Sequence, residues 1–138
     1  MNVVIIYQSR TGKTRRAAEL IGGAIKNQAS SVVVRSIKNI DYEELSEADL
    51  IFVGTWVDGL ILFGHRPGDL QLIRKIPPLW GKRVAAFTTH AVFAGSAPKK
   101  LAKDLSSRGA NIINVQSLHR RYLEIQASDF VNKTMANM

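Results

Sequence analysis

The sequence contains no cysteine, so disulfide bonds, thiolate catalysis and cysteine-ligated metal centres are excluded. No apolar run approaches the roughly 18 residues that a membrane-spanning helix needs. The first residues, Met1 to Tyr7, carry no basic leader. We therefore expect a cytoplasmic protein without a membrane span. Repeats, low-complexity tracts and linkers are missing too, and 138 residues suit a single domain over 1–138.

Acidic residues are few, because 11 Asp and Glu stand against 19 Lys and Arg, giving a formal net charge of +8. Much of the acid lies in the short stretch 41–49, so the rest of the chain is more basic than the total suggests. This balance fits an acidic protein partner, an anionic substrate or surface, nucleic acid, or simply a well-solvated exterior. Nucleic acid is disfavoured, since the basic residues are dispersed over several predicted elements.

Short apolar runs rich in β-branched residues alternate with helical patterns along the chain. Near-continuous apolarity indicates strands buried on both faces. The predicted strands are Val3–Ile6, Val32–Val34, Leu50–Val53, Val84–Phe87 and Ile112–Val115. The predicted helices are Lys13 to about Gln28, Asp69–Ile76, Ala97–Ser107 and Ser128 to about Met135, with one turn at Asp41–Ser46.

This alternation predicts an α/β fold: a doubly wound, five-stranded parallel sheet covered on both faces. In such sheets a ligand lies at the carboxyl ends of the strands, beside the point where the strand order reverses. For the order 2-1-3-4-5 the loops that matter follow the first, third and fourth strands. They are 8–14, 54–68 and 88–96.

The first loop lies between a buried strand and a helix and reads Ser9-Arg10-Thr11-Gly12-Lys13-Thr14. Its glycine permits close approach of the backbone to a ligand, and its hydroxyls are hydrogen-bond donors. The following helix adds unpaired N–H groups and the positive end of its dipole. We therefore predict that this loop binds a phosphate.

The nucleoside-triphosphate loop G-x-x-x-x-G-K-[ST] is the nearest competing motif, because Gly12-Lys13-Thr14 matches its end. Its first glycine, however, would fall at Tyr7, which belongs to the strand. The third strand also ends without an acid to hold magnesium. Together with the absence of a dinucleotide G-x-G-x-x-G fingerprint, this argues against a triphosphatase or a dinucleotide enzyme.

The spacing Ser9-x-Thr11-Gly12-x-Thr14 after an apolar strand resembles the phosphate loop of flavodoxins. The resemblance extends over nearly the whole chain in the order and length of the elements. It implies a flavodoxin-like three-layer sandwich, non-covalent binding of FMN, and electron transfer. It further implies that the phosphate is held by the backbone N–H and hydroxyl groups of Ser9, Arg10, Thr11, Gly12, Lys13 and Thr14.

The second loop resembles the flavodoxin segment in which a threonine and an aromatic residue flank the flavin ring. We expect its cofactor contacts at Thr55, Trp56, Val57, Asp58 and Gly59. Stacking of an indole on the ring is worth about 0.5–1.5 kcal/mol beyond burial. The pair Asp58-Gly59 occupies the place of the flexible peptide that, in flavodoxins, turns toward the flavin N5–H on reduction.

The third loop departs from the flavodoxin pattern, because it offers neither a tyrosine nor an acid. We expect Phe93 or His90 to stack on the ring and Thr89 to reach its edge, and the full set of expected contacts is Thr88, Thr89, His90, Phe93 and Gly95. A metal site is not expected, since His65, His90 and His119 lie on separate segments without a nearby acid at ligand spacing.

The leading hypothesis is an FMN-binding flavodoxin-like protein that passes electrons to a partner with an acidic docking surface. One alternative is a small FMN-dependent reductase or oxidase acting on a quinone, a porphyrin-type ring or another anion. Another is a flavodoxin-like binding module that has lost its flavin. The protein is expected to be a monomer or a homodimer, because the short final helix Ser128–Met135 leaves part of one sheet face for another subunit to cover.

Overall fold

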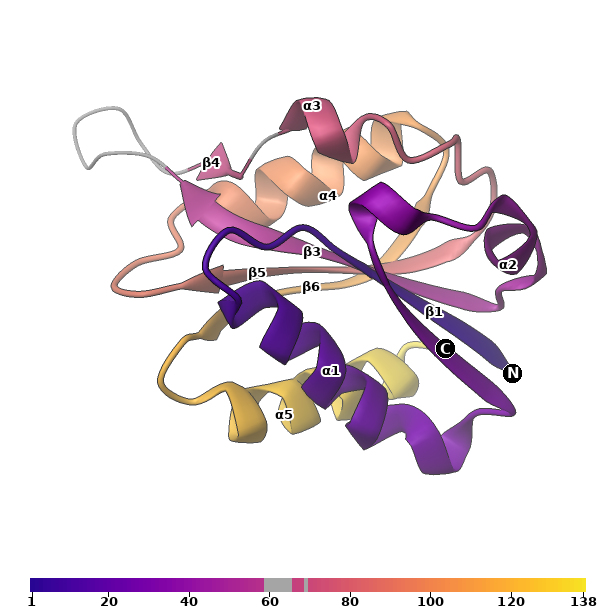
Figure 1. Cartoon of the computed structure of the whole chain (residues 1–138), viewed down its shortest axis with the longest axis horizontal. Coiled ribbons are helices and arrows are strands. Elements are labelled where there is room, and N and C mark those ends of the chain that lie inside the picture. The colour runs from indigo at the N-terminus through magenta and orange to yellow at the C-terminus, as the bar shows by residue number, and fades with distance from the viewer. Residues whose placement is uncertain (59–65, 69) are drawn as a thin grey trace.

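Five parallel strands form the central sheet of the protein (Figure 1), whose computed structural model describes residues 1–58, 66–68 and 70–138. The strands are β1 (Asn2–Tyr7), β2 (Ser31–Ser36), β3 (Leu50–Asp58), β5 (Arg83–His90) and β6 (Asn111–His119). They lie in the order β2-β1-β3-β5-β6, which confirms the predicted order 2-1-3-4-5. A two-residue strand, β4 (Arg66–Pro67), pairs antiparallel with the end of β3 and was not predicted.

Helices cover both faces of the sheet, as the alternating pattern predicted. The helices are α1 (Lys13–Ile25), α2 (Tyr42–Glu47), α3 (Leu70–Ile73), α4 (Ala97–Ser107) and α5 (Leu123–Ala136). In Figure 1, α1 and α5 lie side by side below the sheet, while α3 and α4 lie above it. The 3-10 turns Lys26–Gln28 and Ile37–Asn39 follow α1 and β2.

The alternation of side chains along β1 explains why its apolar run is continuous. Val3 and Ile5 pack into the cluster formed with α1 and α5, whereas Val4 and Ile6 pack into the cluster formed with α2, α3 and α4. None of the four is more than 4% exposed. Burying each such side chain stabilises the fold by roughly 1.5–3 kcal/mol, so the two faces stabilise the same strand.

All five strands extend beyond the apolar runs that predicted them, and β3, β5 and β6 extend furthest at their carboxyl ends. Parallel pairing between β3 and β5 continues through Thr55 with Thr88 and through Trp56 with Thr89. Threonine and tryptophan suit a pleated, half-buried surface, so polarity alone does not end these strands. The predicted loops 54–68 and 88–96 were therefore wrong in their first residues, since 54–58 and 88–90 are strand.

The final helix was also predicted too short. The sequence analysis began it at Ser128, but α5 starts at Leu123 and Ser128 lies inside it on the exposed side. Leu123, Ala127 and Phe130 recur at helical spacing and are buried against α1 and the sheet. The final helix thus covers more of this face than the sequence predicted.

The amino end of α2 is set by a side-chain cap, and α3 is shorter than predicted. Asp41 caps α2, because its Oδ1 accepts hydrogen bonds from the N–H groups of Glu43 and Glu44 at 2.9 and 3.2 Å. The predicted turn at Asp41–Ser46 is therefore confirmed as a helix. The predicted helix Asp69–Ile76 is shorter, since α3 ends at Ile73, and Asp69 lies outside the described residues.

Replacing two glycines by alanine should give opposite effects on stability. A Cβ atom at Gly54 would overlap the Phe87 ring, whereas one at Gly23 on the exposed side of α1 would meet nothing within 4 Å. We expect Gly54→Ala to lower the free energy of unfolding by about 1–3 kcal/mol or more. Gly23→Ala should raise it by about 0.5–1 kcal/mol. Urea titrations of both variants measure these changes, and equal shifts would contradict the tight contact at Gly54.

Candidate functional site

The first loop is held in shape by its own backbone. The N–H of Gln8 donates to the carbonyl of Gly54 at 2.9 Å, which fastens the end of β1 to β3. The Ser9 hydroxyl accepts a hydrogen bond from the N–H of Gly12 at 3.0 Å. Gly12 itself has φ 93°, a left-handed conformation that favours glycine. The loop therefore turns sharply into the first residue of α1.

The amino end of α1 is uncapped. Its N-cap Gly12 has no side-chain hydrogen bond to offer, and the first turn contains no acid. The first N–H of the helix to find an acceptor is that of Arg16, which donates to Gly12; within the described part of the chain, those of Lys13, Thr14 and Arg15 have none. Free N–H groups and the positive end of a helix dipole are the features by which helix amino ends bind anions.

The side chain of Thr14 is buried behind the first loop. Its side chain is 1% exposed, and its hydroxyl forms a 2.8 Å hydrogen bond with the hydroxyl of Thr89 on β5. This bond joins two of the predicted site segments in the buried layer beneath α1. The backbone N–H of Thr14 has no acceptor among the described residues.

Trp56 lies between Arg10 and Gly68. The Arg10 guanidinium carbon is 5.4 Å from the centre of the indole ring, a cation–π contact worth about 0.5–1 kcal/mol at an exposed site. Gly68 packs so closely that a Cβ atom there would overlap the indole, and its N–H donates to the Trp56 carbonyl at 2.7 Å. These contacts fix the half-buried indole beside the first loop.

Several buried polar atoms near the carboxyl ends of β1 and β3 lack a hydrogen-bond partner among the described residues. They are Oε1 of Gln8, Oγ1 of Thr55 and Nε1 of Trp56. A buried polar group left unpaired costs roughly 1–3 kcal/mol. Such groups gathered in one place are typical of a site that completes its hydrogen bonds with a ligand.

A second polar cluster joins the carboxyl ends of β5 and β6. The hydroxyl of Ser117 lies 2.6 Å from Oγ1 of Thr88, which donates to it, and 2.6 Å from Nδ1 of His90. The rings of His90 and His119 meet edge to face, 5.2 Å apart. Burial lowers the pKa of His90 below its usual value, and the charges of His119 and Arg120 lower it further.

The remaining predicted site residues are less enclosed or only partly described. Val57 pairs with Pro67, and Asp58, the last residue of β3, pairs with Arg66. Thr11 and Lys13 are exposed, Phe93 is 63% exposed, and Gly95 has φ 54° in the turn after β5. Gly59 lies outside the described residues, as does His65.

The sequence analysis missed the contribution of β6. Ser117 was not singled out, and His119 was not expected to lie beside His90, because the register that joins them is set by strand pairing. Gln8, which is 5% exposed, was also missed. No three His, Asp or Glu side chains of the described residues come together as a possible metal site. None of the described helices is long and apolar enough to cross a membrane.

A five-stranded, doubly wound parallel sheet with helices on both faces places the chain in the class of flavodoxin-like α/β folds. A family model described as a flavodoxin domain matches residues 4–117. The chain belongs to this flavodoxin domain family. A search of curated proteins found no match.

Solved flavodoxin structures are similar to the chain over its full length. The two-electron reduced flavodoxin of Megasphaera elsdenii is 19% identical with a TM-score of 0.79, covering 97% of this chain and 98% of that one. Oxidised flavodoxin 2 of Bacillus cereus is 22% identical with a TM-score of 0.74, covering 100% of both. The flavodoxin of Fusobacterium nucleatum bound to flavin mononucleotide is 12% identical with a TM-score of 0.70, covering 100% and 99%. These likenesses show a shared fold.

The hydroxyl pair of Thr14 and Thr89 is open to a double-mutant cycle. Thr14→Val or Thr89→Val alone leaves one buried hydroxyl unpaired, which should lower the free energy of unfolding by about 1–3 kcal/mol. The double variant removes both hydroxyls and should lose less than the sum of the two. Urea titrations of the four proteins give the coupling energy, and strictly additive losses would show that the bond contributes nothing.

The lowered pKa of His90 makes a definite prediction about pH. In the unfolded chain His90 takes up a proton near its usual pKa of about 6.5, whereas the folded chain resists protonation. The unfolded state then binds more protons, so stability is lost as the pH falls through this range. Between about pH 8 and about pH 5.5, the wild type should lose more free energy of unfolding than His90→Gln. Parallel pH profiles of the two proteins would contradict the burial effect.

Proposed function

We propose that this protein binds FMN and carries electrons between protein partners. The observation that supports it most directly is the uncapped amino end of α1 behind the loop 8–14, with free N–H groups and no acid in its first turn. A phosphate dianion suits such an end, because it accepts several N–H bonds and is attracted by the helix dipole. Bound FMN would supply the electron-accepting and electron-donating chemistry.

Each residue of the loop has a distinct role in this proposal. The exposed Thr11 supplies a hydroxyl, and Lys13 and Thr14 supply N–H groups from the first turn of α1. Ser9 binds the N–H of Gly12, so it holds the loop in shape. Arg10 lies over the indole of Trp56 and joins the phosphate region to the region proposed for the ring.

We propose that the isoalloxazine ring lies over the carboxyl ends of β3 and β5. The unpaired Gln8 and Thr55 oxygens are available there as acceptors and the Trp56 Nε1–H as a donor. Thr88 and Thr89 stand beside Thr55 and Trp56 in the parallel register, which supports a single shared site. His90 is largely neutral at pH 7, because its pKa is lowered, and so adds little charge to this end of the sheet.

The charge of the molecule bears on its partner. With a net charge of +8, the protein is attracted to an acidic docking surface rather than a basic one. An electron carrier needs only short-lived complexes with its partners. Complementary charge raises the association rate of such complexes more than it raises their affinity.

The first test is the colour and content of the purified protein. We expect a yellow protein that releases free FMN on denaturation, and a colourless protein that fails to take up added FMN would overturn the proposal. If the yellow protein oxidises NAD(P)H with a quinone, without a separate reductase, the small-reductase alternative is favoured instead.

Substitution at Thr11 tests the position of the phosphate. Thr11→Asp brings a carboxylate beside the phosphate, and we expect FMN affinity to fall at least about 100-fold through like-charge repulsion. Thr11→Asn, of similar size and uncharged, is the matched control and should lose far less. Both side chains are tolerated at this exposed position, so thermal melting should be unchanged. Fluorescence titration with FMN measures both affinities, and equal affinities would move the phosphate away from this loop.

A further inference from the structure

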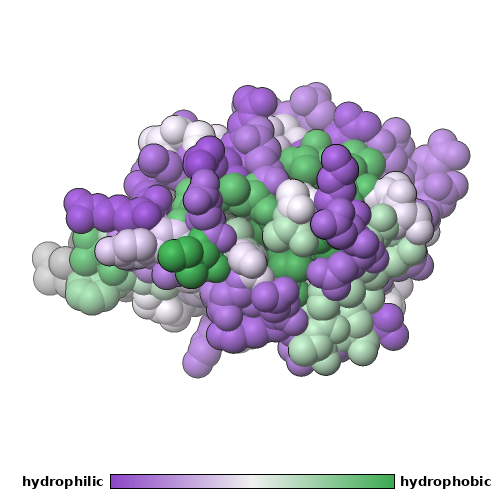
Figure 2. Space-filling view, turned by 90° about the horizontal axis from the view of Figure 1, so that it is seen from below, coloured by the Kyte–Doolittle hydropathy of each residue, from purple (hydrophilic) through white to green (hydrophobic). Residues whose placement is uncertain are grey.

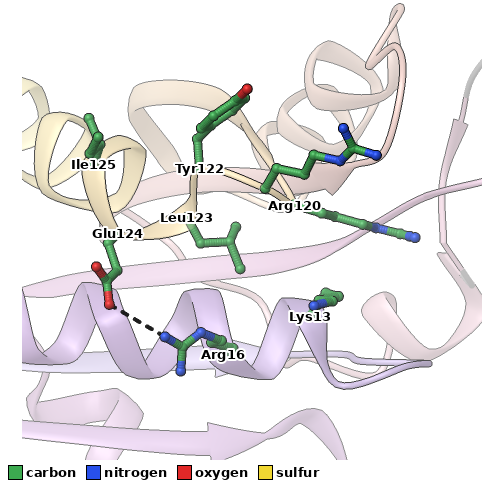
Figure 3. A pocket seen from close by; sticks show the side chains of 8 residues that line it. Lys13, Arg16, Arg120, Tyr122, Leu123, Glu124 and Ile125 are labelled. Carbon is green, nitrogen blue, oxygen red and sulfur yellow. Dashed lines mark hydrogen bonds and ion pairs between the residues drawn. The ribbon is translucent and has the colours of Figure 1, made fainter.

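Basic side chains converge where β6 turns into α5 (Figure 3). Arg120 and Arg121 from this turn, together with Lys13 of α1, line two adjoining hollows. Arg16, one turn further along α1, lines the first hollow only. Figure 3 shows α1 and the start of α5 facing one another across this first hollow. The cations therefore come from segments far apart in sequence.

These cations are poorly neutralised by the protein itself. Glu124 is the one acid lining either hollow, and its bond to Arg16 is long, at 3.5 Å, with both side chains largely exposed. Such an exposed pair contributes little. Within the described residues, Lys13, Arg120 and Arg121 form no ion pair, and Nε of Arg120 is buried without a partner.

Large apolar side chains stand exposed among the cations. Ile125 is 75% exposed and Tyr122 56%, and both line the first hollow. Val92, 71% exposed, lines the second hollow. Figure 2 shows the face of α1 and α5, on which apolar side chains emerge among hydrophilic ones, including on the side where α5 begins. Apolar side chains with a polar rim are typical of a protein–protein interface.

We infer that an acidic redox protein docks on this basic–apolar surface, formed by Lys13, Arg16, Val92, Arg120, Arg121, Tyr122 and Ile125. The inference rests on the proposed function, because Lys13 belongs both to this surface and to the phosphate loop. A docked partner therefore lies next to the proposed cofactor. The inference extends the proposed function by naming where the partner binds. It also names what the partner's surface carries, which is carboxylates around an apolar centre.

A protein fits this surface better than a small anion. A phosphate or a small carboxylate would neutralise the cations but leave Val92 and Ile125 in water. A partner of ordinary interface size, roughly 800 Å² on each side, reaches both. The exposed cations at the rim would accelerate the encounter at low salt, and the apolar side chains would hold the docked pair at any salt concentration.

The docking surface can be mapped without flavin. An acidic [2Fe–2S] ferredoxin of known charge, added to the 15N-labelled protein, should shift the amide resonances of 91–93 and 120–125 above all others. Arg121→Glu should weaken this binding about tenfold at low salt, and the difference should vanish at about 0.5 M salt, where the Debye length is only a few Å. Ile125→Gln should weaken it about threefold at both salt concentrations.

Lys26→Glu is the matched control. It makes the same change of net charge on an exposed side chain at the other end of α1, about 20 Å from Lys13. It should weaken binding less than twofold. Equal effects of Arg121→Glu and Lys26→Glu would show that only total charge matters and would overturn the inference.

Two further outcomes would overturn it: ferredoxin shifts spread over other faces, or no shifts at all. Inorganic pyrophosphate serves as the small-anion probe, and micromolar binding by it at the same resonances would make this a small-anion site instead. Because the map needs no cofactor, a colourless protein that still binds ferredoxin here would end the proposed function but not the docking surface. A yellow protein that shows no ferredoxin-induced shifts at these residues would end the docking surface but not the proposed function.

Discussion

The parallel register of β3 against β5 is the constraint on which the site depends. It sets Thr55 beside Thr88 and Trp56 beside Thr89, so polar side chains from segments more than 30 residues apart end at one edge of the sheet. Gly54 makes this possible, because only a residue without a Cβ atom leaves room for the Phe87 ring, which also contacts the Phe130 ring of α5. A bulky contact in the core thereby fixes the alignment of the polar ends just beyond it.

Buried polar side chains lie at this edge of the sheet, although the apolar core alone does not require them. The hydroxyls of Thr14 and Thr89 satisfy one another beneath α1, so the helix is attached to the sheet close to its amino end. Other buried polar atoms, those of Gln8 and Thr55, are left unpaired by the described residues. Stability has been given up there, at the edge where doubly wound parallel sheets generally bind their ligands.

The sequence predicted what local patterns determine. Apolar runs such as Val3–Ile6 located the strands, and the residues around Gly12 located the first loop, because each signal is contained in a few neighbouring residues. The strand order was predicted from the resemblance to flavodoxins. The end of β3 was missed because threonine pairs well in a strand. The start of α5 was missed because Ser128 suits an N-cap, although it lies inside the helix. The contact between His90 and His119 could not be predicted, because it depends on a register shared by two distant strands.

Charge is distributed unevenly from one end of the sheet to the other. The acids of 41–49 lie near the amino ends of the strands, where Asp49 accepts a hydrogen bond from the N–H of Asn2, while the cations of the basic–apolar surface lie at the carboxyl ends. The dipole of α1 has its positive end at the carboxyl edge as well. The acidic stretch is partly neutralised, because Arg35 pairs with Glu44. Lys13, Arg120 and Arg121 at the carboxyl edge form no ion pair among the described residues. Near an acidic partner this contrast would favour approach with the carboxyl edge forward, so orientation would begin before the two surfaces meet.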